Sequence, residues 1–268
     1  MSLALLLGLA LSAADPCAGT EPGALQSAAE DLDRGRLARA DYVSSQALSD
    51  NPDCPQALVI QGRVLSLKGR PLEARQSLEK AVGLDPGNAE ARYRLGVWLY
   101  RRQLFPEAVQ QLEKAAALRP ADARAHDHLA LSLEGLGDAE RAEDAYRSAL
   151  KVNDAAFADP FLDYYYGRFL LKQNRLAESR SHLDRAIAQH PTERAVHYER
   201  GKLNLAVRDY AAARQDAERA LSLRDPDGLV LDLQLYYLLA TVYARLGESE
   251  LARKYAELAR TTRVPDSP

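Results

Sequence analysis

The five histidines are the first residues to test for chemistry, because imidazole can bind a metal ion and can transfer protons near neutral pH. His126 and His128 are two positions apart, which on a helix turns their side chains about 200° from one another. They cannot share one metal ion in that arrangement. His182, His190 and His197 lack the His-x-x-x-His spacing that places two ligands on one helical face. We therefore expect no metal site and interpret the histidines as packing or surface residues.

Other motifs of catalysis are missing from the sequence. It contains no glycine-rich phosphate loop followed by Lys-Ser or Lys-Thr, no G-x-S-x-G elbow, and no cysteine pairs at zinc-finger spacing. Its carboxylates are spread along the chain among compensating Arg and Lys residues, which is typical of solvated helix faces. We predict that the protein is not an enzyme and requires no cofactor.

The two cysteines, Cys17 and Cys54, could form a disulfide that fixes the amino-terminal end of the fold. That bond needs Cα atoms within about 7 Å of one another, which a sequence cannot show. Two free thiols are the alternative.

The first residues resemble a secretory signal. An apolar run from Leu3 to Leu11 precedes the small residues Ser12, Ala13 and Ala14, although no Lys or Arg comes before it. The run is too short to span a bilayer. We predict a signal peptide at 1–14, a short segment at 15–20, and export to the periplasm or envelope of a bacterium. A cytoplasmic location is the alternative.

Composition excludes one class of partner. The 268 residues are 47% hydrophobic and 27% charged, with a formal net charge of −3, so the chain lacks the broad basic character of nucleic-acid-binding proteins. Tyrosine is abundant, with 13 residues against 4 Phe and 1 Trp, which gives most aromatic rings a hydroxyl suited to a wet boundary or a ligand groove.

A unit of 34 residues recurs along the chain, most clearly from Gln56 to Pro120. Three sets of small residues follow it with the same steps of 34, 34, 34, 37, 34 and 39. The first set is Ala47, Ala81, Ala115, Ala149, Ala186, Ala220 and Ala259. The second is Ala40, Ala74, Ala108, Ala142, Ser179, Ala213 and Ala252, and the third is Ala28, Gly62, Gly96, Ala130, Gly167, Gly201 and Ala240. A fixed period of this size indicates stacked repeats, with small side chains where helices approach closely.

A fourth set of residues divides each unit into two helices. It consists of Gly35, Gly69, Gln103, Gly137, Asn174, Arg208 and Gly247. Gly and Asn favour the left-handed conformation that ends a helix, so each unit is predicted to be helix, tight turn, helix. Gln103 and Arg208 depart from this preference, and we expect their turns to be less well specified.

The pattern of small residue, turn, Ala, Leu or Tyr, Ala and Pro at this period resembles the tetratricopeptide repeat. The Leu or Tyr position is occupied by Leu78, Leu112, Tyr146 and Leu183 in successive units. The resemblance covers residues 21–266, with units near 21–54, 55–88, 89–122, 123–156, 160–193, 194–227 and 233–266. It implies an all-α fold, a right-handed α-solenoid of antiparallel helix pairs whose first helices line a concave groove. Such a fold provides a binding surface and implies no reaction.

The family turns set positions of each first helix toward ligands, and these positions give the candidate binding residues. They are Arg63, Tyr93, Arg101, Tyr164, Arg168, Lys172, Tyr198, Lys202, Tyr237 and Arg245. Arg63, Arg168 and Lys202 stand where the family more often carries Asn, so they are the informative members. The set implies a groove for an extended peptide whose apolar side chains lie on tyrosine rings and whose carboxylates meet basic residues. No three successive units carry the Lys, Asn and Arg arrangement of the family's carboxylate clamp.

These observations predict a non-catalytic scaffold that binds a protein or peptide, without nucleic acid and without a membrane span. Analogy with exported members of the family suggests that it assembles or stabilises a cell-envelope complex of the pilus or secretion type. A self-associating structural subunit is one alternative. An accessory or sensor domain of an enzyme complex is another.

Overall fold

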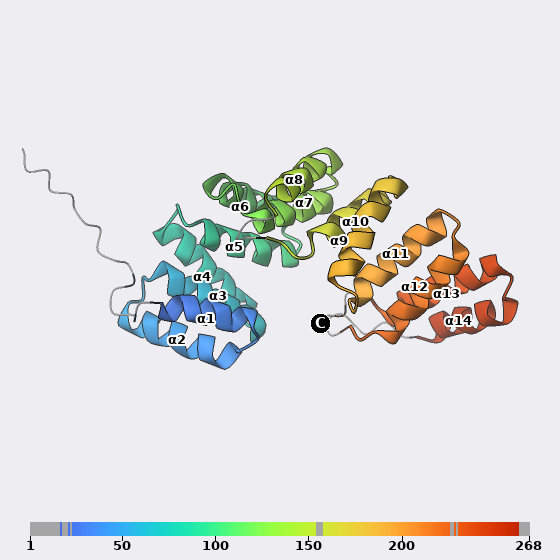
Figure 1. Cartoon of the computed structure of the whole chain (residues 1–268). Helices are drawn as coiled ribbons and strands as arrows, with labels where there is room; N and C mark the ends of the chain where they lie inside the picture. The colour runs from blue at the N-terminus through green and yellow to red at the C-terminus, as the bar shows by residue number, and fades with distance from the viewer. Residues whose placement is uncertain are drawn as a thin grey trace, which may run out of the picture. The chain divides into compact units, whose positions relative to one another are not determined.

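The computed structural model describes Cys17, Glu21 and residues 23–153, 158–225, 228 and 230–262. Within these ranges the chain forms fourteen α-helices and no strand (Figure 1). The prediction of an all-α repeat fold is confirmed. The predicted signal segment at 1–14 lies outside the described residues. In the described part of the chain, no helix is both long enough and apolar enough to cross a membrane.

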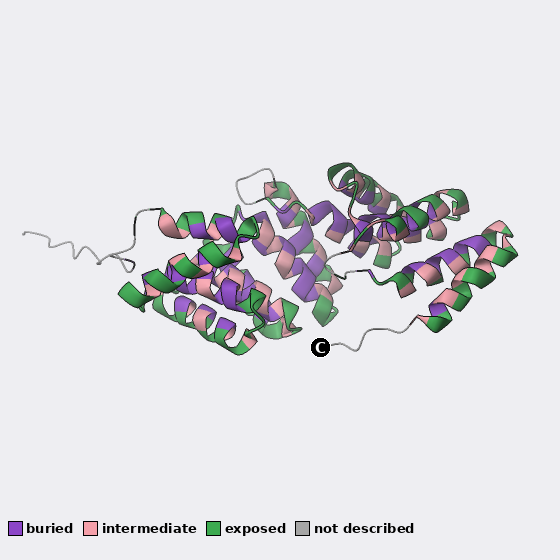
Figure 2. Ribbon diagram, turned by 90° about the horizontal axis from the view of Figure 1, so that it is seen from below, coloured by how far each residue is buried: buried purple, intermediate pink, exposed green. Residues whose placement is uncertain are grey.

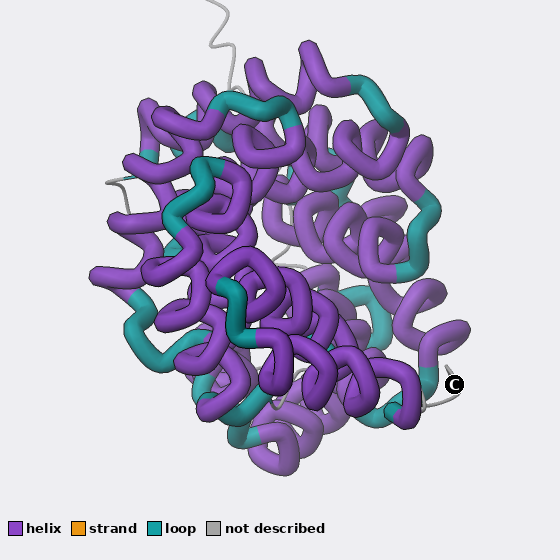
Figure 3. Tube along the Cα trace, turned by 90° about the vertical axis from the view of Figure 1, so that its right-hand side faces the viewer, coloured by secondary structure: helices purple, strands orange, loops and turns teal. Residues whose placement is uncertain are grey.

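The helices belong to two compact units, Met1–Ala158 and Asp159–Pro268. The first unit contains α1 (Ala24–Asp33), α2 (Leu37–Asp50), α3 (Pro55–Leu67), α4 (Pro71–Leu84), α5 (Ala89–Arg101), α6 (Phe105–Leu118), α7 (Ala123–Leu136) and α8 (Ala139–Val152). The second contains α9 (Leu162–Lys172), α10 (Leu176–Gln189), α11 (Arg194–Ala206), α12 (Tyr210–Ser222), α13 (Asp232–Leu246) and α14 (Ser249–Thr261). Short loops join most successive helices (Figure 3).

Each odd-numbered helix packs against the even-numbered helix that follows it, so every repeat is a helix pair. In the first unit, α1, α3, α5 and α7 also contact one another in succession, and in the second α9 contacts α11 and α11 contacts α13. Buried residues face neighbouring helices, whereas exposed residues lie on the outer faces of the pairs (Figure 2). The first helices of each unit therefore form a continuous layer.

The small residues lie where the paired helices meet. All seven alanines of the first set, from Ala47 to Ala259, are buried. A methyl group on Gly96 would lie 2.5 Å from Cγ of Leu112, and one on Gly62 would lie 2.7 Å from Cγ of Leu78, both too close for real atoms. Glycine is required there because a leucine of the second helix fills the space against the first helix.

The turns at Gln103 and Arg208 are as regular as the others, contrary to expectation. Their φ angles are 59° and 64°, in the left-handed region that Gly and Asn occupy in the equivalent turns. Backbone hydrogen bonds hold this conformation, because the amide of the next residue donates to a carbonyl at the end of the first helix: Leu104 to Leu99 at 3.0 Å, and Asp209 to Asn204 at 2.9 Å. The left-handed conformation of a non-glycine residue costs on the order of 1–2 kcal/mol, which the surrounding contacts must offset.

A repeated hydrogen bond fixes three of the links between repeats. A side chain in the first turn of a first helix donates to the carbonyl of the proline that closes the preceding repeat. The pairs are Arg92 with Pro86 at 2.7 Å, His126 with Pro120 at 3.0 Å, and His197 with Pro191 at 3.0 Å. Two of the histidines therefore have a structural contact at equivalent positions.

A disulfide joins Cys17 to Cys54 across 37 positions of sequence, with Cα atoms 4.6 Å apart. Cys54 is the N-cap of α3, and its sulfur accepts a hydrogen bond from the amide of Ala57 at 3.4 Å. Both half-cystines are buried beside Ala47 and Ala57. The bond attaches the segment before α1 to the start of the second repeat.

Candidate binding surface

The first helices of the second unit, α9, α11 and α13, carry most of the candidate binding residues. Their family-defined positions bring Tyr164 and Arg168 from α9, Tyr198 and Lys202 from α11, and Tyr237 from α13 to the layer that these helices form. We call this set, together with Lys172 and Arg245, the basic tyrosine face. Its helices succeed one another in contact, so one extended ligand could touch all three.

On α13 the face is open. The Tyr237 ring is 58% exposed, and Arg245, two helical turns later, is also exposed. Thr241 lies between them in sequence, and its hydroxyl donates to the carbonyl of Tyr237 at 2.9 Å. A large aromatic ring exposed to this degree, on the same helix as an exposed cation, is a surface that a partner side chain can cover.

On α11 the face is half-buried and charged. The ammonium group of Lys202 lies 5.2 Å from the centre of the Tyr198 ring, and it pairs with Glu199 at 2.8 Å. Burial, together with the nearby Glu199 carboxylate, raises the pKa of Tyr198. The Tyr198 hydroxyl therefore remains a neutral donor at physiological pH, while Lys202 retains enough exposure to exchange its partner.

On α9 the tyrosine is largely covered. Tyr164 is only 7% exposed, and burial raises its pKa to about 12 despite the opposing charge of Arg168. The guanidinium of Arg168 lies 5.9 Å from the Tyr164 ring and 5.6 Å from the Tyr165 ring. Arg168, which stays partly exposed, and the exposed Lys172 at the end of α9 are the accessible groups of this helix.

Two of the three candidate residues of the first unit, Tyr93 and Arg63, contact charged side chains of neighbouring residues. Tyr93 is 5% exposed, with the guanidinium groups of Arg94 and Arg124 at 5.1 and 4.8 Å from its ring centre. Arg63 pairs with Asp33 at 2.5 Å, and burial, with repulsion from Arg94, lowers its pKa.

The structure thus divides the candidate residues by access. Tyr93 and Tyr164 are buried, so their rings are not open to a ligand. Of the four candidate tyrosines, only Tyr198 and Tyr237 are accessible. Arg101 is exposed at the end of α5. The sequence did not identify Glu199, Arg94 and Arg124 as neighbours of the site, because these contacts depend on side-chain direction and on a neighbouring repeat.

One profile described as tetratricopeptide repeat matches residues 65–131, and a second with the same description matches residues 24–89, 128–194 and 198–268. The chain belongs to the tetratricopeptide repeat family. The predicted family is therefore confirmed.

Solved tetratricopeptide repeat structures share the fold at low sequence identity. A protein from Parabacteroides merdae is 17% identical, with a TM-score of 0.63 over 90% of this chain and 93% of that one. PilW, described as a widely conserved type IV pilus biogenesis factor, is 18% identical, with a TM-score of 0.68 over 77% of this chain and 93% of that one. At these identities the likeness establishes the fold alone.

Curated sequences give a local match. The human protein O-mannosyl-transferase TMTC3 is 39% identical over 62 residues, which are 23% of this chain and 7% of that protein. The chain therefore spans a small fraction of this relative, and the match covers about two repeats.

Proposed function

We propose that this tetratricopeptide repeat scaffold binds an extended, acidic segment of a partner protein along the basic tyrosine face of α9, α11 and α13. The observation that carries the proposal is the exposed ring of Tyr237 on the same helix as the exposed Arg245. The family fold is consistent with protein–protein interaction, and the proposal adds where the segment lies and what chemistry holds it.

The proposed contacts alternate between apolar and charged groups. An apolar side chain of the partner covers the Tyr237 ring, which removes its large exposed surface from water. Carboxylates of the partner meet Arg168, Lys202 and Arg245, where guanidinium groups can donate two parallel hydrogen bonds. When the partner binds, the Lys202 ammonium either leaves its ion pair with Glu199 or contacts Glu199 and a partner carboxylate together. The extended segment then contacts three successive repeats.

We further propose that the partner belongs to a cell-envelope assembly. The support is the structural likeness to PilW, whose description is that of a pilus biogenesis factor, together with the signal-like first residues. Capture of envelope proteins by residues 15–268, with identification of the bound proteins, tests this part of the proposal.

A charge-reversal experiment tests the binding face. The variant Arg168→Glu with Lys202→Glu should lose an acidic partner, and Tyr237→Ala should weaken its binding independently. The matched control is Lys114→Glu with Arg147→Glu, two exposed cations on the second helices α6 and α8 with the same change in charge. A partner that binds all variants equally well, with unchanged helical circular dichroism, would exclude this face.

Self-association is a second candidate function. The exposed side of α13 and α14 presents Ala240, Ala244, Ala252 and Ala256 around a shallow cavity of about 540 Å³. Small residues allow close approach of another helix, so a second copy could stack there. Light scattering over a range of concentrations decides this candidate, because a concentration-independent monomer excludes it.

A further inference from the structure

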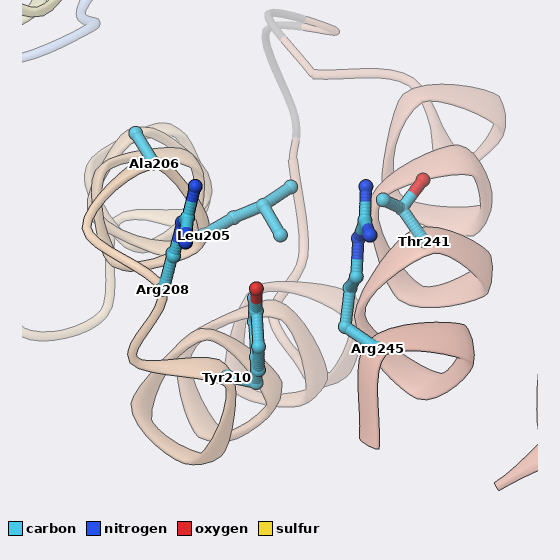
Figure 4. Close-up of a pocket in the computed structure, with 6 residues that line it drawn as sticks. All are labelled: Leu205, Ala206, Arg208, Tyr210, Thr241 and Arg245. Atoms are coloured by element: carbon cyan, nitrogen blue, oxygen red, sulfur yellow. The ribbon is translucent and has the colours of Figure 1, made fainter. Parts of the chain in front are cut away.

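A second cavity of the second unit has the character of an anion site. It has a volume of about 390 Å³ and lies between two successive repeats, lined by residues from the end of α11, the start of α12 and α13. Its lining residues are Leu205, Ala206, Arg208, Tyr210, Thr241 and Arg245. In the view of Figure 4 the hydroxyl of Tyr210 lies between the side chains of Arg208 and Arg245.

The two arginines are not neutralised within the fold. Both are exposed, and neither has an ion pair or side-chain hydrogen bond among the residues that the structure describes. The carboxylates next to them in sequence have other partners. Asp209 accepts from the amide of Ala212 at 3.1 Å as the N-cap of α12, and Glu248 pairs with Arg214 at 3.2 Å. The residues that line the cavity therefore include two positive charges and no carboxylate.

Arg208 occupies its position at a conformational cost. Its φ angle of 64° lies in the left-handed region, where five equivalent turns carry Gly or Asn. A glycine there would adopt the same backbone without strain. Strained residues of this kind are concentrated at ligand sites, where the side chain is needed more than the backbone preference.

We propose that this cavity binds a phosphomonoester dianion. A phosphomonoester carries about −1.5 to −2 charges at neutral pH, which matches two guanidinium groups that are always protonated. A single carboxylate would leave one guanidinium without a counter-charge. The Tyr210 hydroxyl supplies a further donor between the arginines, and the Leu205 side chain, which extends into the space between them (Figure 4), gives the carbon part of the ester an apolar wall.

The proposal goes beyond the peptide-binding function and shares only Arg245 with it. The phosphate could belong to a phosphorylated side chain of a protein segment or to a small phosphorylated metabolite. Both sources present the same dianion to Arg208 and Arg245, so the chemistry of the site is the same in either case.

Isothermal titration calorimetry at low ionic strength tests the site with three probes: phosphoserine blocked at both ends, sn-glycerol 3-phosphate, and aspartate blocked at both ends. We expect a phosphomonoester to bind, and to bind more weakly by about tenfold or more after Arg208→Gly or Arg245→Gln, since each removes a charge-assisted contact. Tighter binding of blocked phosphoserine identifies a protein segment as the source, and tighter binding of glycerol 3-phosphate identifies a metabolite.

Arg208→Gly separates binding from folding. It relieves the left-handed strain and should raise the melting temperature while it weakens phosphate binding. Gln103→Gly is the matched control, because it relieves the same strain at φ 59° in a turn of the first unit and should leave binding unchanged. Arg224→Gln controls for the loss of one exposed arginine outside the cavity.

Three results would overturn the proposal. One is the failure of both phosphomonoesters to bind at millimolar concentration. Another is binding that Arg208→Gly and Arg245→Gln leave unchanged. The third is blocked aspartate binding as tightly as the tighter-binding phosphomonoester. Arg208 is outside the basic tyrosine face. If Arg208→Gly loses phosphate binding but still binds the partner, the phosphate site is distinct from that face.

Discussion

Single small residues determine how closely the helices of each repeat approach. Ala115 is 1% exposed and packs in a cluster with Leu78, Leu95 and Leu112, so it has no room for a larger side chain. We expect Ala115→Leu to lower the free energy of unfolding by about 1–3 kcal/mol, because overpacking forces side chains and backbone out of place. Urea unfolding followed by circular dichroism measures this change.

Ala117→Leu is the control for that substitution. Ala117 is exposed on the same helix, α6, so the added volume meets solvent and should change stability little. Equal unfolding curves for Ala115→Leu and the unmodified chain would contradict the close packing of this position.

His128 illustrates how one partly buried group responds to pH. It lies edge-on to the rings of Tyr93 and Tyr100, with centroid distances of 5.5 and 6.1 Å, and its Nδ1 bonds to the carbonyl of Arg124 at 3.0 Å. Burial, reinforced by repulsion from nearby arginines, lowers its pKa to about 4.

The unfolded chain therefore takes up a proton at His128 at a higher pH than the folded chain does. The stability associated with neutral His128 is present above an unfolded pKa of about 6.5 and is lost as the pH falls from there toward about 4. We expect His128→Gln to make the unfolding free energy less dependent on pH in this range, by up to about 3 kcal/mol in total. Proton NMR of the imidazole measures the midpoint directly, and a midpoint near 6.5 would contradict this account.

At the scale of elements, a buried carboxylate ties α11 to α12. Asp216, which is buried, accepts from Arg200 at 2.7 and 2.9 Å and from the side chain of Asn204 at 2.8 Å. Burial opposes its ionisation, but contacts with His197 and Arg200 outweigh this effect and hold the pKa of Asp216 below its usual value. The stability that it provides is present above an unfolded pKa of about 3.9 and is lost as the pH falls through its lower folded pKa.

Asp216→Asn removes this charge while keeping the shape of the side chain. We expect a loss of about 1–3 kcal/mol in unfolding free energy at pH 7, discounted because Arg200 is partly exposed and can turn to water. Chemical unfolding at pH 7 measures it. At a pH below the folded pKa of Asp216 the difference between the two proteins should shrink, and a constant difference at all pH values would argue against an ionised Asp216.

The Cys17–Cys54 disulfide joins the segment before α1 to the start of α3. For a loop of 37 residues, the entropy model gives a stabilisation of about 3–4 kcal/mol. We expect Cys17→Ala with Cys54→Ala to lower the unfolding free energy by up to this amount in oxidising buffer. With a strong thiol reductant in the buffer, the unmodified chain should unfold like the variant, and equal stability of the two chains without reductant would contradict the stabilising bond.

At the scale of the whole molecule, the sequence predicted the helix pairs because their determinants recur. Buried alanines and the glycine opposite Leu112 depend on contacts inside one repeat, and these contacts repeat with the period. Access to the tyrosines depends on neighbouring repeats, so equivalent positions differ: Tyr93 is buried with Arg94 and Arg124 over its ring, whereas Tyr237 is exposed.

The cavity between the sixth and seventh repeats was not predictable for a related reason. The sequence marked Arg208 only as an unusual turn residue, and its neighbour Arg245 is 37 positions away. No spacing rule within one repeat connects a turn residue to the end of the next first helix. The binding residues of such a fold therefore have to be found in the structure.

Contacts between neighbouring repeats also predict which helices a local defect destabilises. In a repeat array the stability is approximately a sum of repeat and nearest-neighbour terms, so a defect should loosen mainly its own repeat and the adjoining ones. Hydrogen exchange of Asp216→Asn should accelerate in α9 to α14 and stay unchanged in α1 to α4. Ala115→Leu should accelerate exchange in α3 to α8 and leave α13 and α14 unchanged. Uniform acceleration over all helices in both variants would instead show that the chain opens as one cooperative body, since a nearest-neighbour array cannot transmit the two defects equally to every repeat.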